Sequence, residues 1–297
     1  MSDIKKIICD KFKEWQELPI IGDFLKPSKK ISVVKMSGII AESGFRGKGI
    51  SFSKFDDVLE KAFDKSGLEA VALIINSPGG SPAQSMLIGD KIRKLSEEKK
   101  VPVYAFVEDV AASGGYWLAC AADEIYALPV SIVGSIGVIS TGFGLEDFIE
   151  KHNIKRRVYT AGTQKSFLDI FSEEKEEDIK RLKVSLNSIH DEFKGWVRSR
   201  RGDRIKGTDE DLFEGQFWVA REIAETGLID GYGNYHEILK EKFGKEIKLV
   251  DISPKKSMFS FGGGDVSIVN KDIQIENFAY ALVEKVEEKS IYSRYGF

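Results

Sequence analysis

The sequence predicts an α/β protein with a largely parallel sheet, because short apolar runs alternate with amphipathic segments of helical length along most of the chain. Several of the apolar runs end in turns rich in glycine and are followed by helix-compatible sequence, the order expected of parallel strands joined by crossover helices. Of the 297 residues, 42% are apolar and 31% are charged, which is enough apolar sequence for a sizeable core.

The pattern divides the chain into three parts. We expect an amphipathic N-terminal segment over residues 1–27 and the α/β domain over residues 28–257. Residues 258–297 start with a glycine-rich link and continue as a tail, in which Ile275–Glu288 has the pattern of a short helix.

Each element of the domain is predicted from its local pattern. Strands are expected at the apolar runs Ile31–Met36, Val71–Asn76, Val103–Val107, Glu124–Ala127, Val138–Ser140, Lys155–Thr160 and Ile247–Asp251. Helices are expected at Phe55–Lys65, Pro82–Lys99, Tyr116–Ala122 and Glu173–Arg200. Proline is tolerated in a first helical turn, so Pro82 marks a helix start. The last helix keeps an apolar face at three-and-four spacing and is expected to buttress the core.

Composition excludes several classes of partner and location. The net charge is −3 with both signs interspersed, which argues against nucleic acid as a partner. The sequence has neither the ~20 consecutive apolar residues of a membrane span nor the apolar core of a secretory signal. Two cysteines form no disulfide framework, which suits a reducing compartment. These features predict a cytoplasmic protein.

The N-terminal segment leaves two interpretations open. Ile4, Ile8, Phe12 and Trp15 fall on one helical face, with lysines around them. Such a helix packs on its own domain or on a neighbouring subunit, or else it lies on a membrane surface. The second interpretation would make residues 4–15 a peripheral contact with the inner membrane.

A serine turn is the most informative feature of the domain. Ser113 lies between small residues where the run Val103–Val107 gives way to an alanine-rich helical segment. Glycines after the serine leave room for a substrate backbone, and the start of a helix places the hydroxyl near the positive end of the dipole. We therefore predict that Ser113 is a nucleophile.

A nucleophilic serine needs a base, and two kinds of candidate are present. The histidines lie in charged helical contexts typical of exposed or capping side chains: His152, His190 and His236. Lys165 follows a glycine-containing turn and precedes apolar residues. A free lysine has a pKa of about 10.4, but burial lowers a lysine pKa and can leave the amine able to accept a proton. From the residues alone, a surface lysine is the better interpretation, because the chain has many lysines.

Two glycine-rich turns complete the candidate site. In residues 76–80, the amide of Gly80 could bind an oxyanion together with the amide of Gly114, although a strand-to-helix turn needs glycine for shape alone. In residues 134–138, Ser135 could hydrogen-bond the lysine amine and hold it in place, although the same residues fit a tight bend.

The motifs occur in a family-specific order. The sequence resembles the signal peptide peptidase A and SohB family of serine peptidases from about Val33 to Asp251 through four motifs: Asn76–Gly80, Ala112–Tyr116, Asp123–Ala127 and Gly134–Val138. The resemblance implies Ser113 as nucleophile and, 52 residues further on, Lys165 as general base. It also implies an oxyanion donor at Gly80 and a lysine-orienting hydroxyl at Ser135.

The resemblance also implies an architecture and an activity. The fold would be the Clp protease/crotonase-like spiral, assembled as a homo-oligomeric ring or dome. In related assemblies the serine and the lysine come from adjacent domains or subunits. The activity would be that of a serine endopeptidase acting, without cofactor or metal, on unfolded or hydrophobic peptides such as signal-peptide remnants. Two alternatives share this fold: a crotonase-type acyl-CoA enzyme and a non-catalytic oligomeric scaffold.

Two departures from the family pattern bear on these expectations. Members usually carry an N-terminal membrane span, where this sequence has only the amphipathic segment. The lysine motif continues as Leu168-Asp169-Ile170-Phe171, without the proline common in the family, so the wall beside the base is expected to differ.

Overall fold

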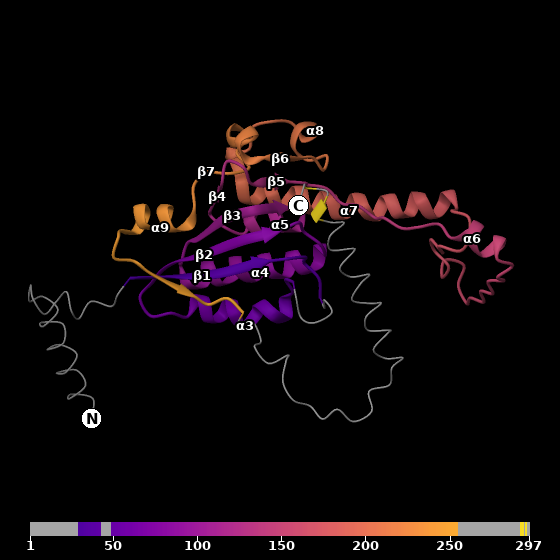
Figure 1. Ribbon diagram of the computed structural model, residues 1–297, viewed down its shortest axis with the longest axis horizontal. Coiled ribbons are helices and arrows are strands. Elements are labelled where there is room, and N and C mark those ends of the chain that lie inside the picture. The colour runs from indigo at the N-terminus through magenta and orange to yellow at the C-terminus, as the bar shows by residue number, and fades with distance from the viewer. Residues whose placement is uncertain (1–28, 43–48, 255–291, 294, 296–297) are drawn as a thin grey trace, which may run out of the picture.

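A parallel sheet organises the chain, as the alternating pattern predicts (Figure 1). The computed structural model describes residues 29–42, 49–254, 292, 293 and 295. Its strands are β1 (Lys30–Ser37), β2 (Leu68–Ser77), β3 (Val103–Ala112), β4 (Glu124–Ala127), β5 (Ile132–Gly134), β6 (Phe217–Val219), β7 (Gly231–Tyr232) and β8 (Lys248–Asp251). The order along the sheet is β6-β5-β3-β2-β1-β8, and only the β5–β6 pair is antiparallel among the described strands. The predicted α/β class is confirmed.

Strand β3 pairs with two different strands along its length, and the second pairing fixes the position of the serine turn. Its first half, Tyr104–Val107, pairs with β4, whereas its last three residues pair with β5. The strand runs five residues beyond the predicted Val103–Val107, because the alanines that precede the turn pair with β5. β4 then continues the sheet to β7. The branched, mostly parallel sheet with flanking helices is consistent with the Clp-protease-like fold expected of the family.

Helices cover both faces of the sheet (Figure 1). They are α3 (Phe52–Phe63), α4 (Pro82–Lys99), α5 (Gly114–Cys120), α6 (Glu146–Lys151), α7 (Glu176–Arg201), α8 (Asp209–Leu212) and α9 (Tyr235–Phe243). The main apolar core lies between the sheet and helices α3, α4, α5 and α7, and a smaller core lies under α9 on the opposite face. Ser81 caps α4 by accepting a hydrogen bond from the amide of Gln84 at 3.4 Å.

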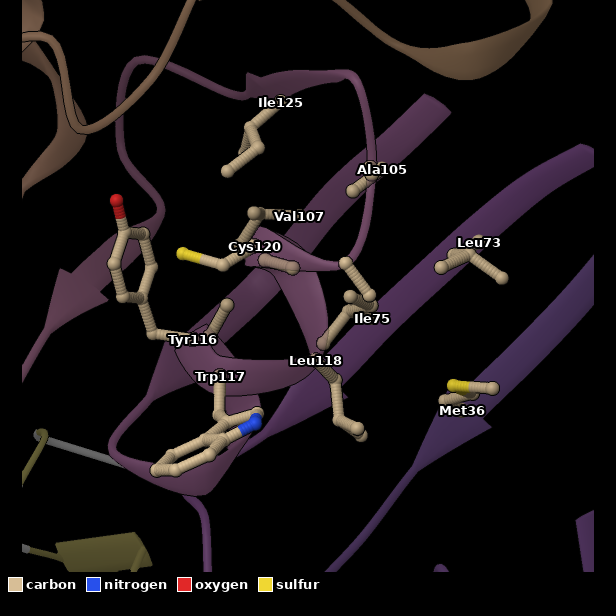
Figure 2. Packing of buried hydrophobic residues seen from close by; sticks show 14 of the residues in the cluster. Met36, Leu73, Ile75, Ala105, Val107, Tyr116, Trp117, Leu118, Cys120 and Ile125 are labelled. Carbon is tan, nitrogen blue, oxygen red and sulfur yellow. The ribbon is translucent and has the colours of Figure 1, made fainter. Parts of the chain in front are cut away.

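The short helix α5 is the centre of the main core. All seven of its residues are buried. Figure 2 shows Trp117, Leu118 and Cys120 of this helix beside core residues of the neighbouring strands. At about 25 cal/mol per Å² of buried apolar surface, a fully buried large side chain contributes about 1.5–3 kcal/mol. Because the helix is fixed by this packing, the residue at its N-terminus, Ser113, has a fixed position.

Two predicted strands are wrong. Neither Val138–Ser140 nor Lys155–Thr160 forms a strand; both belong to an arm of the chain, residues 138–175, that projects beyond the sheet with α6 (Figure 1). Apolar residues in the arm that would have faced a sheet are exposed, such as Val158 at 44% and Tyr159 at 90%. The strand of this region lies earlier, at β5, where β3 supplies hydrogen-bonding partners.

Several predictions lie outside the described residues. These are the amphipathic helix of residues 4–15, the glycine-rich link and the helix Ile275–Glu288. Within the described ranges, none of the helices combines the length and the apolar character needed to cross a membrane.

Candidate active site

Ser113 stands at the junction of β3 and α5 in an unusual backbone conformation. Its φ of 50° and ψ of −123° lie in a region that non-glycine residues rarely adopt. The amide of Ser113 donates to Gly134 O of β5 at 2.9 Å, and its carbonyl accepts the amide of Trp117 at 3.0 Å. Its side chain makes no capping bond to α5. Strain of this kind persists only where the surrounding structure holds it, and it is concentrated at functional sites.

The loop after β2 brings a second amide close to the serine. Gly80 has a φ of 143° and is held against Ile40 by two hydrogen bonds, Ile40 N to Gly79 O at 2.8 Å and Ser81 N to Ile40 O at 2.7 Å. A Cβ atom built on Gly114 would lie 3.4 Å from the Gly80 nitrogen, so the two amides are neighbours. In the described part of the chain, neither amide donates to a loop or turn carbonyl. Both are therefore available to an incoming oxygen.

The approach of this loop depends on glycine. A Cβ on Gly79 would lie 2.8 Å from Ser113 Cβ and 2.9 Å from Gly114 N, closer than real Cβ atoms come. A Cβ on Gly80 would lie 2.9 Å from Ile40 N and closer still to the Ile40 carbonyl oxygen. Glycines at these positions are needed for the close packing of two backbones, not only to make a turn.

An apolar pocket of about 100 Å³ opens beside the serine and the two amides. The loop after β2, α5, the start of the arm and α7 each contribute to its wall. It is lined by Gly80, Pro82, Ser113, Gly114, Trp117, Gly137, Val138, Ile139, Ile189 and Phe193. The rings of Trp117 and Phe193 stack with centroids 5.0 Å apart, which gives the pocket one rigid wall.

The contribution of α7 to this pocket is not evident from the sequence. The spacing of its apolar residues predicted a helix packed on the core, and Phe193 is buried as expected. The same face also contributes Ile189 to the pocket, and His190 lies 3.2 Å from Ile136 O, beside the pocket wall. Helical periodicity signals that a face is covered, but it does not signal what covers it.

Arginines hold the far end of α5. Arg93 Nη1 donates to Ala121 O at 3.2 Å, and Arg200 Nε donates to Cys120 O at 3.0 Å. Arg204 Nη1 donates to the backbone oxygen of Asp123 at 2.8 Å. Cations near the C-terminal end of a helix satisfy its free carbonyls and oppose its dipole. The nucleophile helix is thus anchored at the end opposite Ser113.

An ion pair between Arg201 and Asp230 lies beneath this anchor. Arg201 is 1% exposed and its Nη1 is 2.7 Å from Asp230 Oδ2, an oxygen that also accepts the amide of Ile125 at 2.7 Å. Burial alone would raise the pKa of Asp230, but the hydrogen bond from Arg201 and its charge hold that pKa below the ordinary range. The pair links the end of α7 to the turn before β7.

Ser135 lies next to the serine turn but outside the pocket lining. It has a φ of 53°, and its amide donates to Gln216 O at 2.6 Å. Its hydroxyl accepts a hydrogen bond from the phenol of Tyr295 at 3.3 Å, whose ring packs edge-on against Phe217. The predicted lysine-orienting hydroxyl therefore contacts a residue from the C-terminus of the same chain.

Lys165 does not reach Ser113 within one chain. It is exposed on the arm, in a turn where its amide donates to Gly162 O at 3.3 Å, and it does not line the pocket. Figure 1 shows α6 of the arm well separated from α5. The fold thus brings together Ser113, Gly80 and Gly114, with Ser135 nearby, and leaves Lys165 apart.

The mostly parallel sheet with flanking helices and the strained serine at the start of α5 are the features expected of a serine peptidase with a Clp-protease-like fold, and comparison with known sequences gives its family. Residues 95–248 match peptidase family S49, so the chain belongs to that family, as the resemblance predicted.

Named relatives agree with this assignment. The chain is 29% identical to a protein assigned the name signal peptide peptidase SppA from Enterococcus faecium over 228 residues, covering 75% of this chain and 65% of that protein. It is 30% identical to Protease 4 of Haemophilus influenzae over 226 residues, covering 76% of this chain and 36% of that protein.

A longer relative carries a different name. The chain is 42% identical over 272 residues to a protein of Brucella abortus named Na(+)/H(+) antiporter NhaA, covering 90% of this chain but 37% of that protein. This chain therefore spans little more than a third of that relative, whose name describes the longer protein.

Proposed function

We propose that this chain is a serine endopeptidase in which Ser113 is the nucleophile and Lys165 the general base. The observation that carries the proposal is the position of Ser113, whose uncapped hydroxyl lies beside two free amides and an apolar pocket. An acyl-transfer enzyme needs these three elements in one place: a nucleophile, donors for the oxyanion and a binding site for the side chain of the substrate.

The proposed reaction has two stages. The uncharged amine of Lys165 takes the proton of Ser113 as Oγ bonds to the peptide carbonyl carbon, and the amides of Gly80 and Gly114 bind the resulting oxyanion. The lysine then gives its proton to the leaving nitrogen, the C–N bond breaks, and an acyl-enzyme remains. Water, deprotonated by the same amine, hydrolyses the ester and releases the serine. Ser135 would hold the amine in place, with Tyr295 displaced from its hydroxyl.

We further propose that the lysine acts on a neighbouring copy of the chain. Two observations support this. Lys165 is exposed and remote from its own Ser113, and the arm that carries it exposes large apolar side chains, including Phe143 at 84% and Tyr159 at 90%. Exposed apolar surface of this kind is typical of an interface. A homo-oligomeric ring or dome would cover the arm and bring the amine to the next serine.

The pocket supports a substrate class. Its walls are mainly apolar, and about 100 Å³ suits a small or medium apolar side chain. Ala111 and Ala112, which precede Ser113, are buried, and Trp117, Ile189 and Phe193 provide the apolar surface. We propose unfolded or hydrophobic peptides, of the kind left from signal peptides, as substrates.

Labelling with a serine-directed fluorophosphonate tests the nucleophile. The wild type should be labelled, and Ser113→Ala should not be. Ser66→Ala, which changes an exposed serine of a surface turn, is the matched control and should label like the wild type. Equal labelling of Ser113→Ala and wild type would rule out the nucleophile. Lys165→Ala should fold normally and lose peptide turnover, and full turnover in that variant would rule out the base.

A further inference from the structure

The turn that carries Lys165 is braced by one arginine of α7. The guanidinium of Arg181 lies over the ring of Phe167, 5.6 Å from its centroid, and Nη1 is 3.4 Å from Gln164 Oε1. These contacts fall on either side of Lys165 in the sequence. A planar guanidinium can stack and donate at once, which a lysine in the same place could not do equally well.

A second side chain of α7 holds the same turn one residue beyond Phe167. The amide of Leu168 donates to Asp178 Oδ2 at 3.4 Å, and Asp178 is only 8% exposed. Leu168 has a φ of 48°, a left-handed conformation that is strained for a residue with a branched side chain and persists only when neighbours hold it. Asp178 and Arg181 are three residues apart, so they share one face of the helix.

We propose that Arg181 is a positioning residue for Lys165, acting with Asp178 to fix the turn that presents the amine to the serine of a neighbouring copy. This inference rests on the proposed function. A lysine side chain has many rotamers, and a base must come within hydrogen-bond reach of the proton it removes. Fixing the backbone of the turn reduces the number of positions that the amine can occupy, so a larger fraction of them is productive. Arg181 and Asp178 both belong to the long helix α7, which gives them a rigid support.

The chain contains a matched control on the same helix. Arg198 is also exposed, lies 5.3 Å from the centroid of Phe213 and pairs with Asp209. Like Arg181, it combines a contact with an aromatic ring and one polar partner, but its partner is a carboxylate instead of an amide, and it lies at the other end of α7. A general loss of helix stability should appear in both variants, whereas loss of lysine positioning should appear in one.

The first experiment compares steady-state peptide hydrolysis by Arg181→Met and Arg198→Met, with thermal unfolding as a check on folding. Misplacing a catalytic group by about 1 Å costs up to about 100-fold, so we expect kcat of Arg181→Met to fall about 10- to 100-fold with KM changed by less than about twofold. Arg198→Met should stay within about twofold of the wild type. Arg181→Lys should recover part of the loss. Equal effects of the two methionine variants would overturn the proposal.

The second experiment asks which chain needs the arginine. Co-expression of Ser113→Ala with Lys165→Ala should restore activity at about one quarter of the interfaces, where an intact serine meets an intact lysine. Adding Arg181→Met to the Ser113→Ala chain, which supplies the lysine, should remove most of this activity. Adding it to the Lys165→Ala chain should not. A loss that is equal in both placements, or absent from both, would overturn the positioning role.

These results separate the inference from the proposed function. Full activity of Lys165→Ala alone would defeat the dyad itself. An inactive mixture, with both single variants also inactive, would place the dyad within one chain, and the comparison of Arg181→Met with Arg198→Met would then decide the positioning role by itself.

Discussion

Replacing Gly80 by alanine should remove oxyanion binding while leaving the core in place. A Cβ at this position would lie 2.9 Å from Ile40 N and closer to Ile40 O, both backbone atoms that cannot rotate away. The φ of 143° also disfavours any side chain. The loop must therefore move, and the Gly80 amide moves with it.

The magnitude follows from these two effects. Loss of one oxyanion donor costs about 10²–10³ in kcat, or about 2.7–4 kcal/mol of transition-state stabilisation. The strained backbone would cost about 1–3 kcal/mol of folding stability, which a domain of ordinary stability survives. We therefore expect a folded protein with kcat lowered at least about 100-fold and KM altered far less, because the donor acts mainly in the transition state.

The assay is steady-state hydrolysis of a fluorogenic peptide, with denaturant unfolding to confirm the fold. Gly195→Ala is the control, because a Cβ there meets nothing within 4 Å and alanine favours a helix interior. This variant should keep wild-type activity and gain about 0.5–1 kcal/mol in stability. A Gly80→Ala protein that is folded and turns over at the wild-type rate would refute the assignment of the Gly80 amide.

Three further predictions concern the pocket and the core. Ile189→Ala should enlarge the pocket and raise the kcat/KM ratio for phenylalanine over alanine beside the cut by about tenfold in a peptide series; an unchanged ratio would remove Ile189 from the specificity pocket. Asp230→Asn should lower the free energy of unfolding at pH 7 by about 3–5 kcal/mol, since it leaves a buried Arg201 unpaired. The pKa of Asp230 is lower in the folded than in the unfolded protein, so its contribution to stability is present above the unfolded pKa of about 3.9 and is lost as pH falls through the folded pKa. The free energy of unfolding should therefore change less between pH 7 and about pH 3 in Asp230→Asn than in the wild type; an equal change in both would contradict this. Burial raises the pKa of Cys120 to about 12, so in a Cys9→Ser background iodoacetamide should label the protein only after unfolding, and rapid labelling of the native protein would contradict this packing.

The sequence by itself was sufficient for the core elements and for the serine turn. β2 contains the continuous apolar run Val71–Ile75 followed by turn residues, and β1 is apolar at most of its inner positions. α4 has both its proline start and its serine cap in the sequence. Ser113 could be singled out because a serine between small residues at a strand-to-helix turn is a local feature. Such features depend on neighbours within a few residues, so they can be recognised from the sequence without knowledge of the fold.

The arm shows where local patterns fail. Lys155–Thr160 ends in three residues that favour strands, Val158, Tyr159 and Thr160, yet its side chains are exposed because no other strand of the described chain lies beside it. An apolar pattern indicates that a segment packs against another part of the protein. Which element or subunit it packs against is decided by the tertiary or quaternary structure.

Only the tertiary structure decided which residues form the candidate site. It placed Gly80 against Gly114 through the backbone of Ile40, turned Ile189 and Phe193 of α7 toward the pocket, and left Lys165 outside it on a turn braced by Arg181. These relations join residues separated by tens of positions in the chain. They are fixed by how helices pack on the branched sheet, and packing depends on the shapes of surfaces that meet only after the chain has folded.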